Sequence, residues 1–172
     1  MVLAADQSTV PLGPERIGPV DGPRRDAGLA AFDRRAAGGA TDLGRALEAG
    51  ADALPEDAPG AMVVYVGDGW PTLGDATLAD MEARLARRPG GAPRLAAVAI
   101  GPLANRPLLT ALTRSAGPLL EVADASEAAA AAVRLLVEGL RPTYAGVQVE
   151  LEPFVERIYP RTACAVRAGD TL

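Results

Sequence analysis

The chain has 172 residues, enough for one hydrophobic core or for one domain and part of a second. Its net charge of −5 argues against a nucleic-acid or anionic-membrane surface, which would need a basic stripe. It contains no histidine and no lysine, so Ser-His and Cys-His catalytic pairs, histidine-bound zinc and Schiff-base chemistry are excluded. The single cysteine, Cys164, cannot form an internal disulfide.

No apolar stretch approaches the roughly 20 residues that a transmembrane helix needs. Residues 1–6 lack both the positive segment and the apolar core of a signal peptide. The sequence therefore predicts neither a membrane span nor a signal, and it indicates no cellular compartment.

The chain opens with two short predicted strands. Val2–Ala5 is apolar and of strand length, residues 6–9 form a polar turn, and Val10–Leu12 follow as a second strand. Pro11 places this second strand at a sheet edge, because proline cannot donate a ladder hydrogen bond. Residues 24–36 then predict a helix that ends before two glycines at 38 and 39.

The central part of the chain alternates predicted helices with apolar strands. Thr41 and Asp42 both suit the N-cap of a helix that carries Leu43 and Leu47 on one side. Residues 62–66 are apolar without alternation, which predicts a strand covered on both faces. Further along, the pattern predicts a helix at 78–88, a strand at 94–100, a helix at 107–115 and a strand at 119–122. Ser126 is then expected to cap a long, alanine-rich helix that runs through Leu140.

This alternation predicts an α/β fold, a doubly wound, Rossmann-like and mostly parallel sheet with helices on both faces. After Arg141 the pattern changes, since Val147, Val149 and Leu151 alternate with polar residues. We therefore expect one domain at 1–140 and the start of a β-rich segment at 141–172.

Two loops carry the residues suited to binding a metal ion. In an open α/β sheet, ligands bind beyond the carboxyl ends of the strands, where Gly38–Asp42 and Gly67–Gly69 are expected to lie. The Thr41 hydroxyl and the Asp68 carboxylate suit Mg²⁺ or Ca²⁺, with Asp42 a weaker candidate. Each also has a purely structural interpretation: Thr41 and Asp42 as helix caps, and Asp68 as a turn residue between two glycines.

These motifs resemble those of von Willebrand factor A (vWA) domains. Residues 38–47 (GGATDLGRAL) resemble the family's threonine motif, and residues 63–71 (VVYVGDGWP) resemble its fourth strand with an Asp-Gly turn. The resemblance covers roughly residues 1–140. Residues 147–160 further resemble the segment after the vWA domain in proteins of the inter-alpha-trypsin-inhibitor heavy-chain type, which carry a VIT domain upstream.

The resemblance implies a metal ion-dependent adhesion site (MIDAS) in which Thr41 and Asp68 are the second and third elements. The first element, a D-x-S-x-S motif on the family's first strand, is missing. Asp6-Gln7-Ser8 does not replace it, because Val10 occupies the place of the second serine and the 35 positions from Asp6 to Thr41 cannot hold the intervening elements. The resemblance therefore implies an N-terminally truncated domain that lacks a central strand and helix.

Such a truncation leads us to expect a chain of marginal stability, prone to aggregation at open strand edges, with weak Mg²⁺ or Ca²⁺ binding. The leading functional hypothesis is a non-enzymatic protein-binding module, whose partner supplies an Asp or Glu that completes the metal coordination. The alternatives are a structural remnant or gene fragment without metal binding and, third, a metal-assisted hydrolase that uses Asp68 and Asp75.

Overall fold

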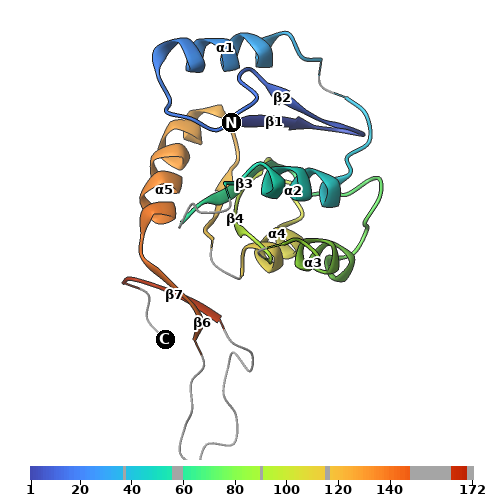
Figure 1. The fold of residues 1–172 in the computed structure, drawn as a ribbon, viewed down its shortest axis with the longest axis vertical. Coiled ribbons are helices and arrows are strands. Elements are labelled where there is room, and N and C mark those ends of the chain that lie inside the picture. Colours follow the sequence, from blue (N-terminus) through green and yellow to red (C-terminus); the bar gives the residue numbers. More distant parts are fainter. Residues whose placement is uncertain (37, 56–59, 90, 115–116, 148–163, 170–172) are drawn as a thin grey trace, which may run out of the picture. The chain divides into compact units, whose positions relative to one another are not determined.

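The computed structural model describes residues 1–36, 38–55, 60–89, 91–114, 117–147 and 164–169. These residues belong to two compact units: Met1–Val63 with Gly69–Pro93, and Val64–Asp68 with Arg94–Leu172. The polypeptide enters the second unit at residue 64, returns to the first at residue 69 and leaves it again after residue 93 (Figure 1).

The first unit begins with an antiparallel pair of strands. Strand β1 (Val2–Ala5) pairs with β2 (Thr9–Leu12), and Val2 lies opposite Leu12. The connecting turn is closed by the Asp6 carboxylate, whose Oδ1 accepts a hydrogen bond from the Ser8 backbone N–H at 2.9 Å. Both predicted strands are confirmed, and within the described residues β2 pairs with β1 alone, as the proline at position 11 requires.

Helix α1 (Gly22–Asp33) starts at the Asp21 N-cap, with a proline in its first turn. It is shorter than the predicted helix at 24–36, because the helical backbone ends at the Arg34 C-cap. None of its residues is buried, and both Leu29 and Phe32 are exposed. Its main neighbour in the first unit is β2.

Two further helices build the core of the first unit. Helix α2 (Leu43–Asp52) packs against α3 (Leu78–Ala86), and both have side-chain N-caps, Asp42 and Thr77. The buried apolar side chains of the two helices are those of Leu43, Leu47, Ala51, Met81 and Leu85. This burial explains why α2 and α3 show clear helical periodicity in the sequence.

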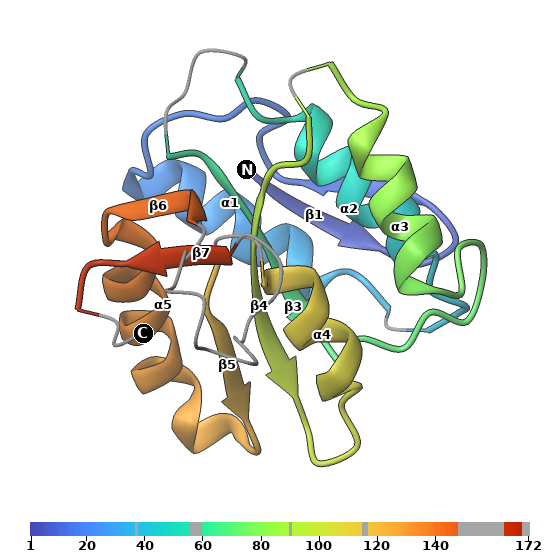
Figure 2. The same cartoon turned by 90° about the horizontal axis from the view of Figure 1, so that it is seen from below.

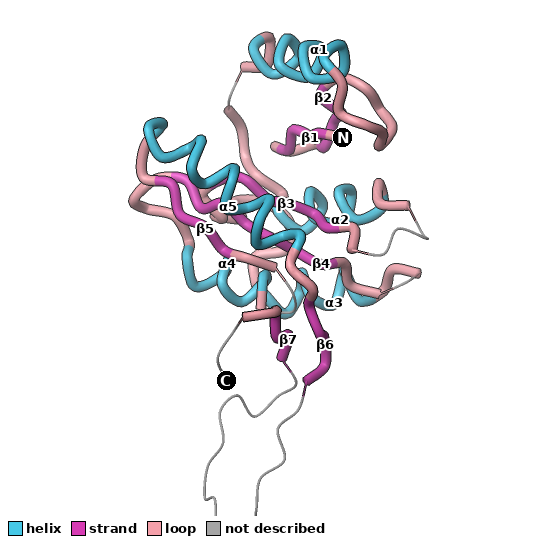
Figure 3. The backbone as a smooth tube through the Cα atoms, turned by 90° about the vertical axis from the view of Figure 1, so that its left-hand side faces the viewer, coloured by secondary structure: helices cyan, strands magenta, loops and turns pink. Residues whose placement is uncertain are grey.

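The second unit contains a parallel sheet of order β3-β4-β5, formed by β3 (Met62–Gly67), β4 (Arg94–Ile100) and β5 (Leu119–Val122) (Figure 2). Helix α4 (Arg106–Thr113) covers one face, where Leu109 packs on Ala97 and Ala99. Helix α5 (Ala128–Leu140) covers the other, over Val98 and Leu120 (Figure 3). The predicted α/β class is thereby confirmed.

Strand β3 differs from its prediction, because it is not covered on both faces. Tyr65 packs into the cluster on the α4 side, whereas Val64 and Val66 are exposed. The main contacts of α5 with the sheet are those with β4 and β5. The run of apolar residues at 62–66 therefore correctly indicates a strand but does not show that both faces of the strand are buried.

The start of α5 also differs from its prediction. Ser126 does not cap the helix, because it lies inside a 3₁₀ turn, Ala125–Glu127, that precedes α5. The Asp124 carboxylate accepts hydrogen bonds from both the backbone N–H and the hydroxyl of Ser126. The Ser126 hydroxyl therefore donates to Asp124 within the 3₁₀ turn, and it does not cap α5.

At the C-terminal end, β6 (Thr143–Val147) pairs antiparallel with β7 (Cys164–Arg167), with an irregularity between Tyr144 and Val147. Predicted strand positions Val149 and Leu151, and residues 148–160 of the heavy-chain-like segment, lie outside the described residues. The predicted domain boundary near residue 140 stays a prediction. Within the described part of the chain, no helix is long and apolar enough to cross a membrane.

Candidate functional site

The Thr41–Asp42 segment lies at the N-terminus of α2, as predicted from its spacing. The Asp42 carboxylate caps the helix: its Oδ1 accepts a hydrogen bond from the Arg45 backbone N–H at 3.0 Å. The Asp42 side chain is nearly buried, and its backbone N–H donates to the Asp6 carbonyl oxygen at 3.1 Å. The structural interpretation of Asp42 is therefore confirmed.

The backbone of Thr41 is held by the loop that precedes α3. Its carbonyl oxygen accepts hydrogen bonds from the N–H groups of Thr72 and Leu73, at 3.0 and 3.1 Å, and its own N–H donates to the Thr72 hydroxyl at 2.7 Å. No hydrogen bond of the Thr41 hydroxyl is found among the described residues. Thr41 thus has a fixed backbone and a hydroxyl that remains available to a ligand.

The same loop presses closely on the start of α2 at two glycines. A Cβ at Gly74, which has φ of +71°, would clash with the Asp42 carboxylate. A Cβ at Gly44 would clash with the Asp75 carboxylate. Both glycines are required by these close approaches, which bring two carboxylates against the first turn of α2.

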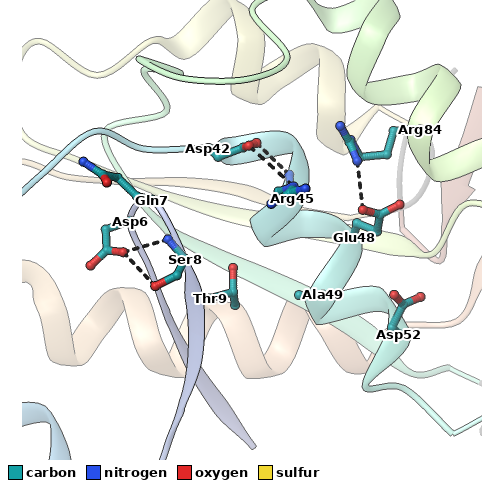
Figure 4. A pocket seen from close by; sticks show the side chains of 10 residues that line it. All are labelled: Asp6, Gln7, Ser8, Thr9, Asp42, Arg45, Glu48, Ala49, Asp52 and Arg84. Atoms are coloured by element: carbon teal, nitrogen blue, oxygen red, sulfur yellow. Dashed lines mark hydrogen bonds and ion pairs between the residues drawn. The ribbon is translucent and has the colours of Figure 1, made fainter.

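A polar pocket of about 380 Å³ opens beside α2 in the first unit (Figure 4). The β1–β2 turn forms one side, from Asp6 to Thr9, and residues of α2 form the other. The charged side chains that line it are those of Asp6, Asp42, Arg45, Glu48, Asp52 and Arg84. With four carboxylates and two guanidinium groups, its lining has a net negative charge.

Ion pairs neutralise much of this charge. Hydrogen bonds from the Ser8 backbone and the nearby Arg35 guanidinium lower the pKa of Asp6, although partial desolvation opposes this. Arg84 bridges Asp75 and Glu48, with its Nη1 at 2.9 Å from Glu48. Hydrogen bonding to Arg84 lowers the pKa of Asp75, and the two carboxylates together raise the pKa of Arg84.

Asp68 belongs to the second unit, at the end of β3. Its carbonyl oxygen accepts a hydrogen bond of 2.7 Å from the backbone N–H of Asn105, the N-cap of α4. This bond fixes the Asp-Gly turn to α4, and the Asp68 side chain is exposed. Because Thr41 lies in the first unit and Asp68 in the second, their joint action on one ion stays a prediction.

Within the described residues, no group of three or more acidic or cysteine side chains is arranged to hold a metal ion. Three residues were not anticipated from the sequence: Thr72 and Gly74, which lie against Thr41 and Asp42, and Arg84, which binds Glu48 and Asp75. They are more than 30 positions from Thr41 and match no motif. The one local signal is the glycine at position 74, which is typical of a turn but does not indicate what the turn contacts.

No family model and no curated protein sequence matches the chain. Among solved structures, it is similar to a von Willebrand factor type A protein from Catenulispora acidiphila, with 22% sequence identity and a TM-score of 0.56. The similarity covers 80% of this chain and 32% of that one, so this chain spans about a third of that protein's length. The chain therefore has a vWA-like fold, which confirms the fold that the motifs implied.

Proposed function

We propose that the chain is a non-enzymatic protein-binding module in which Thr41 and Asp68 contribute to a weak site for a divalent cation. An Asp or Glu side chain of the protein partner would complete the coordination of that ion. The fold supports this proposal, since it is similar to that of a von Willebrand factor type A protein. The ion expected is Mg²⁺ or Ca²⁺, because hydroxyl and carboxylate oxygens are hard ligands.

The observation that carries the proposal is the state of Thr41. Three hydrogen bonds to Thr72 and Leu73 hold its backbone, while its hydroxyl has no hydrogen-bond partner among the described residues. A helix cap does not need this arrangement, because the neighbouring Asp42 already caps α2. The arrangement suits a ligand oxygen whose position is set by its backbone.

The geometry gives less support to hydrolysis. Asp75, the second carboxylate of a hydrolase mechanism, is bound to Arg84, and this contact lowers its pKa. A carboxylate made less basic in this way is a poorer general base at neutral pH. We therefore retain the non-enzymatic proposal and assign Asp75 a structural role beside α2.

A structural remnant without metal binding is the second candidate. It is considered because the sequence lacks the D-x-S-x-S element that the resemblance implies for the metal site. The finer assignment to the heavy-chain type, with its VIT domain, belongs to the proposal as well. It depends on residues 147–160, of which the structure describes Val147.

The test uses Mn²⁺ alone, an ion of similar ligand preference whose free form is measured by electron paramagnetic resonance. We expect dissociation constants of about 10⁻⁴–10⁻³ M, as in weak oxygen-ligand sites. Thr41→Val removes the hydroxyl at nearly constant shape, and Asp68→Asn removes the charge. Each should weaken binding about tenfold or more.

The matched controls are Thr110→Val on α4 and Glu82→Gln on α3, both exposed and outside the two loops. They should leave Mn²⁺ affinity unchanged. No binding by the unsubstituted chain would favour the structural remnant. Equal binding by all variants would place the ion elsewhere and remove Thr41 and Asp68 from the site.

A further inference from the structure

The two peptide units on either side of Thr41 are both held by hydrogen bonds. In the preceding unit, the Thr41 N–H donates to the Thr72 hydroxyl at 2.7 Å. In the following unit, the carbonyl oxygen accepts from the N–H groups of Thr72 and Leu73, and the N–H of Asp42 donates to the Asp6 carbonyl oxygen at 3.1 Å. Because each peptide unit is planar, holding both units fixes the direction of the Thr41 Cα–Cβ bond.

Asp6 supports this segment from the side opposite to Thr72. In a trans peptide unit the C=O and N–H groups point in opposite directions. The loop before α3 therefore holds the Thr41–Asp42 peptide unit at its oxygen, and Asp6 holds it at its nitrogen. If the bond to Asp6 is lost, this unit can tilt about the bonds at its oxygen. The direction of the Thr41 side chain thus depends on where the Asp6 backbone lies.

The position of Asp6 is in turn set by its own carboxylate. Its Oδ1 accepts hydrogen bonds from the Ser8 N–H at 2.9 Å and from the Ser8 hydroxyl at 3.3 Å (Figure 4). Its Oδ2 accepts from Nη2 of Arg35 at 2.5 Å. Arg35 directly follows Arg34, the C-cap of α1. One carboxylate oxygen therefore closes the β1–β2 turn, and the other joins this turn to the end of α1.

Asp6 contacts the connection between α1 and α2 at more than one position. Its carboxylate binds Arg35 at the start of the connection, and its carbonyl binds Asp42 at the end. A Cβ built on Gly39 would lie 3.8 Å from the Asp6 Cβ, which is an ordinary contact distance. The side chains of Asp6 and Arg35 are only 31% and 28% exposed, so water and salt screen their ion pair less than an open surface pair.

We propose that Asp6 is a positioning residue for Thr41. Its ion pair with Arg35 keeps the Asp6 carbonyl against the Asp42 N–H and so sets the direction of the Thr41 hydroxyl. Both oxygens of the Asp6 carboxylate already bind Ser8 and Arg35, so Asp6 acts through the backbone and not as a metal ligand. The consequence for ion binding rests on the proposed function, in which Thr41 is a ligand.

Two variants break the ion pair from opposite sides. Asp6→Asn keeps an oxygen that can accept from Ser8, but it replaces the oxygen that binds Arg35 with an NH₂ group, which cannot accept. Arg35→Gln removes the guanidinium and leaves Asp6 unchanged. Arg34→Gln is the matched control, because it removes the same charge at the neighbouring, exposed position.

Amide hydrogen exchange, measured by NMR on the full chain, tests the backbone contact. Relative to the Met81 N–H in α3, the Asp42 N–H should exchange about fivefold faster or more in Asp6→Asn and in Arg35→Gln. Arg34→Gln should leave this ratio unchanged. A general loss of stability would accelerate both amides by the same factor, because global unfolding exposes both, and would not change the ratio.

Mn²⁺ affinity, measured by electron paramagnetic resonance, tests the consequence for the ion. Asp6→Asn and Arg35→Gln should each weaken binding about tenfold, as replacing a residue that orients a metal ligand does. Arg34→Gln should bind as the unsubstituted chain does. The double variant Asp6→Asn/Arg35→Gln should bind no more weakly than either single variant, because all three lack the same ion pair.

An unchanged exchange ratio in either single variant would overturn the positioning role, and so would additive losses of affinity in the double variant. If the unsubstituted chain binds Mn²⁺ and Asp6→Asn binds it equally well, the positioning role fails while the proposed function stands. If the unsubstituted chain binds no Mn²⁺, the proposed function fails, and the exchange ratio alone decides whether Asp6 holds the Thr41 backbone.

Discussion

At the first turn of α2, the backbone of Gly74 lies very close to the Asp42 carboxylate. Asp42 caps the helix, and its carboxylate lies where a side chain on Gly74 would have to be. The positive φ of Gly74 turns the loop so that the Thr72 and Leu73 N–H groups reach the Thr41 carbonyl. One glycine therefore fixes the backbone of the residue that we propose as a metal ligand.

Gly74→Ala should lower the free energy of unfolding by about 2–4 kcal/mol. Left-handed backbone costs alanine about 1 kcal/mol, and the clash with Asp42 adds the loss of a helix cap or an equivalent rearrangement. Gly101→Ala is the matched control, since φ is +82° there and nothing lies within 4 Å of the added Cβ. In urea denaturation the control should lose about 1 kcal/mol. Equal losses in both variants would remove the steric role of Asp42.

Sequence analysis found part of this site and could not find the rest. Thr41, Asp42 and Asp68 stand close to glycines at the ends of apolar or helical runs, and this local signal is readable. The contacts of Thr72 with Thr41 and of Gly74 with Asp42 join positions about 30 residues apart. No periodicity or short motif encodes such a pairing, so it becomes visible only in the folded chain.

Between elements, Arg84 connects the start of α2 with α3. From α3 its guanidinium binds Glu48 on α2 and Asp75 in the preceding loop. The three side chains are 19–34% exposed, which places their charges in a partly desolvated setting. The pair of helices thus has a polar contact beside the buried Leu43–Met81 core.

Arg84→Met should cost about 1–3 kcal/mol at pH 7, because two carboxylates lose a charged hydrogen-bond partner. The contact with Arg84 lowers the pKa of Asp75 in the folded state below its unfolded value near 3.8. The contribution of this carboxylate to the free energy of unfolding is therefore fully present above pH 3.8. It is lost as the pH falls through the folded-state pKa. Urea denaturation at pH 7, 5 and 3 should therefore show a difference between wild type and variant that is constant at pH 7 and 5 and smaller at pH 3. A constant difference down to pH 3 would contradict this.

The boundaries of three strands could be predicted from apolar runs of strand length. The predicted strands at 2–5, 94–100 and 119–122 match β1, β4 and β5 residue for residue. The faces of the elements were less predictable. The Leu and Val residues of α5 occupy both sides of the helix, and only packing on β4 and β5 decides that Leu135 points inward while Leu136 does not.

Across the whole molecule, the strand β3 is divided between the two units. Met62 and Val63 belong to the first, and Val64–Asp68 belong to the second, where Tyr65 packs with Ala97 and Leu109. The second unit therefore depends on a short segment that is separated from the rest of it by the 25 residues of the span 69–93.

A fragment of residues 94–172 should accordingly fail to form the second unit. Without β3 it loses the Tyr65 side chain from the α4-side cluster and exposes one edge of β4. We expect weak helical circular dichroism and no cooperative thermal transition, in contrast to the full chain under the same conditions. A synthetic peptide of residues 61–68 added in excess should restore part of the signal. A fragment that melts cooperatively without the peptide would show that β3 is dispensable.

This division of β3 bears on how such a gene can change by recombination. A single crossover anywhere between codons 64 and 93 separates residues of one unit from each other, because the chain passes from one unit to the other three times. Neither unit can be exchanged, duplicated or fused to another protein intact through one breakpoint in that interval. Inheritance should keep the two units together, so lineages are expected to vary them by point substitution and loop insertion and not by shuffling.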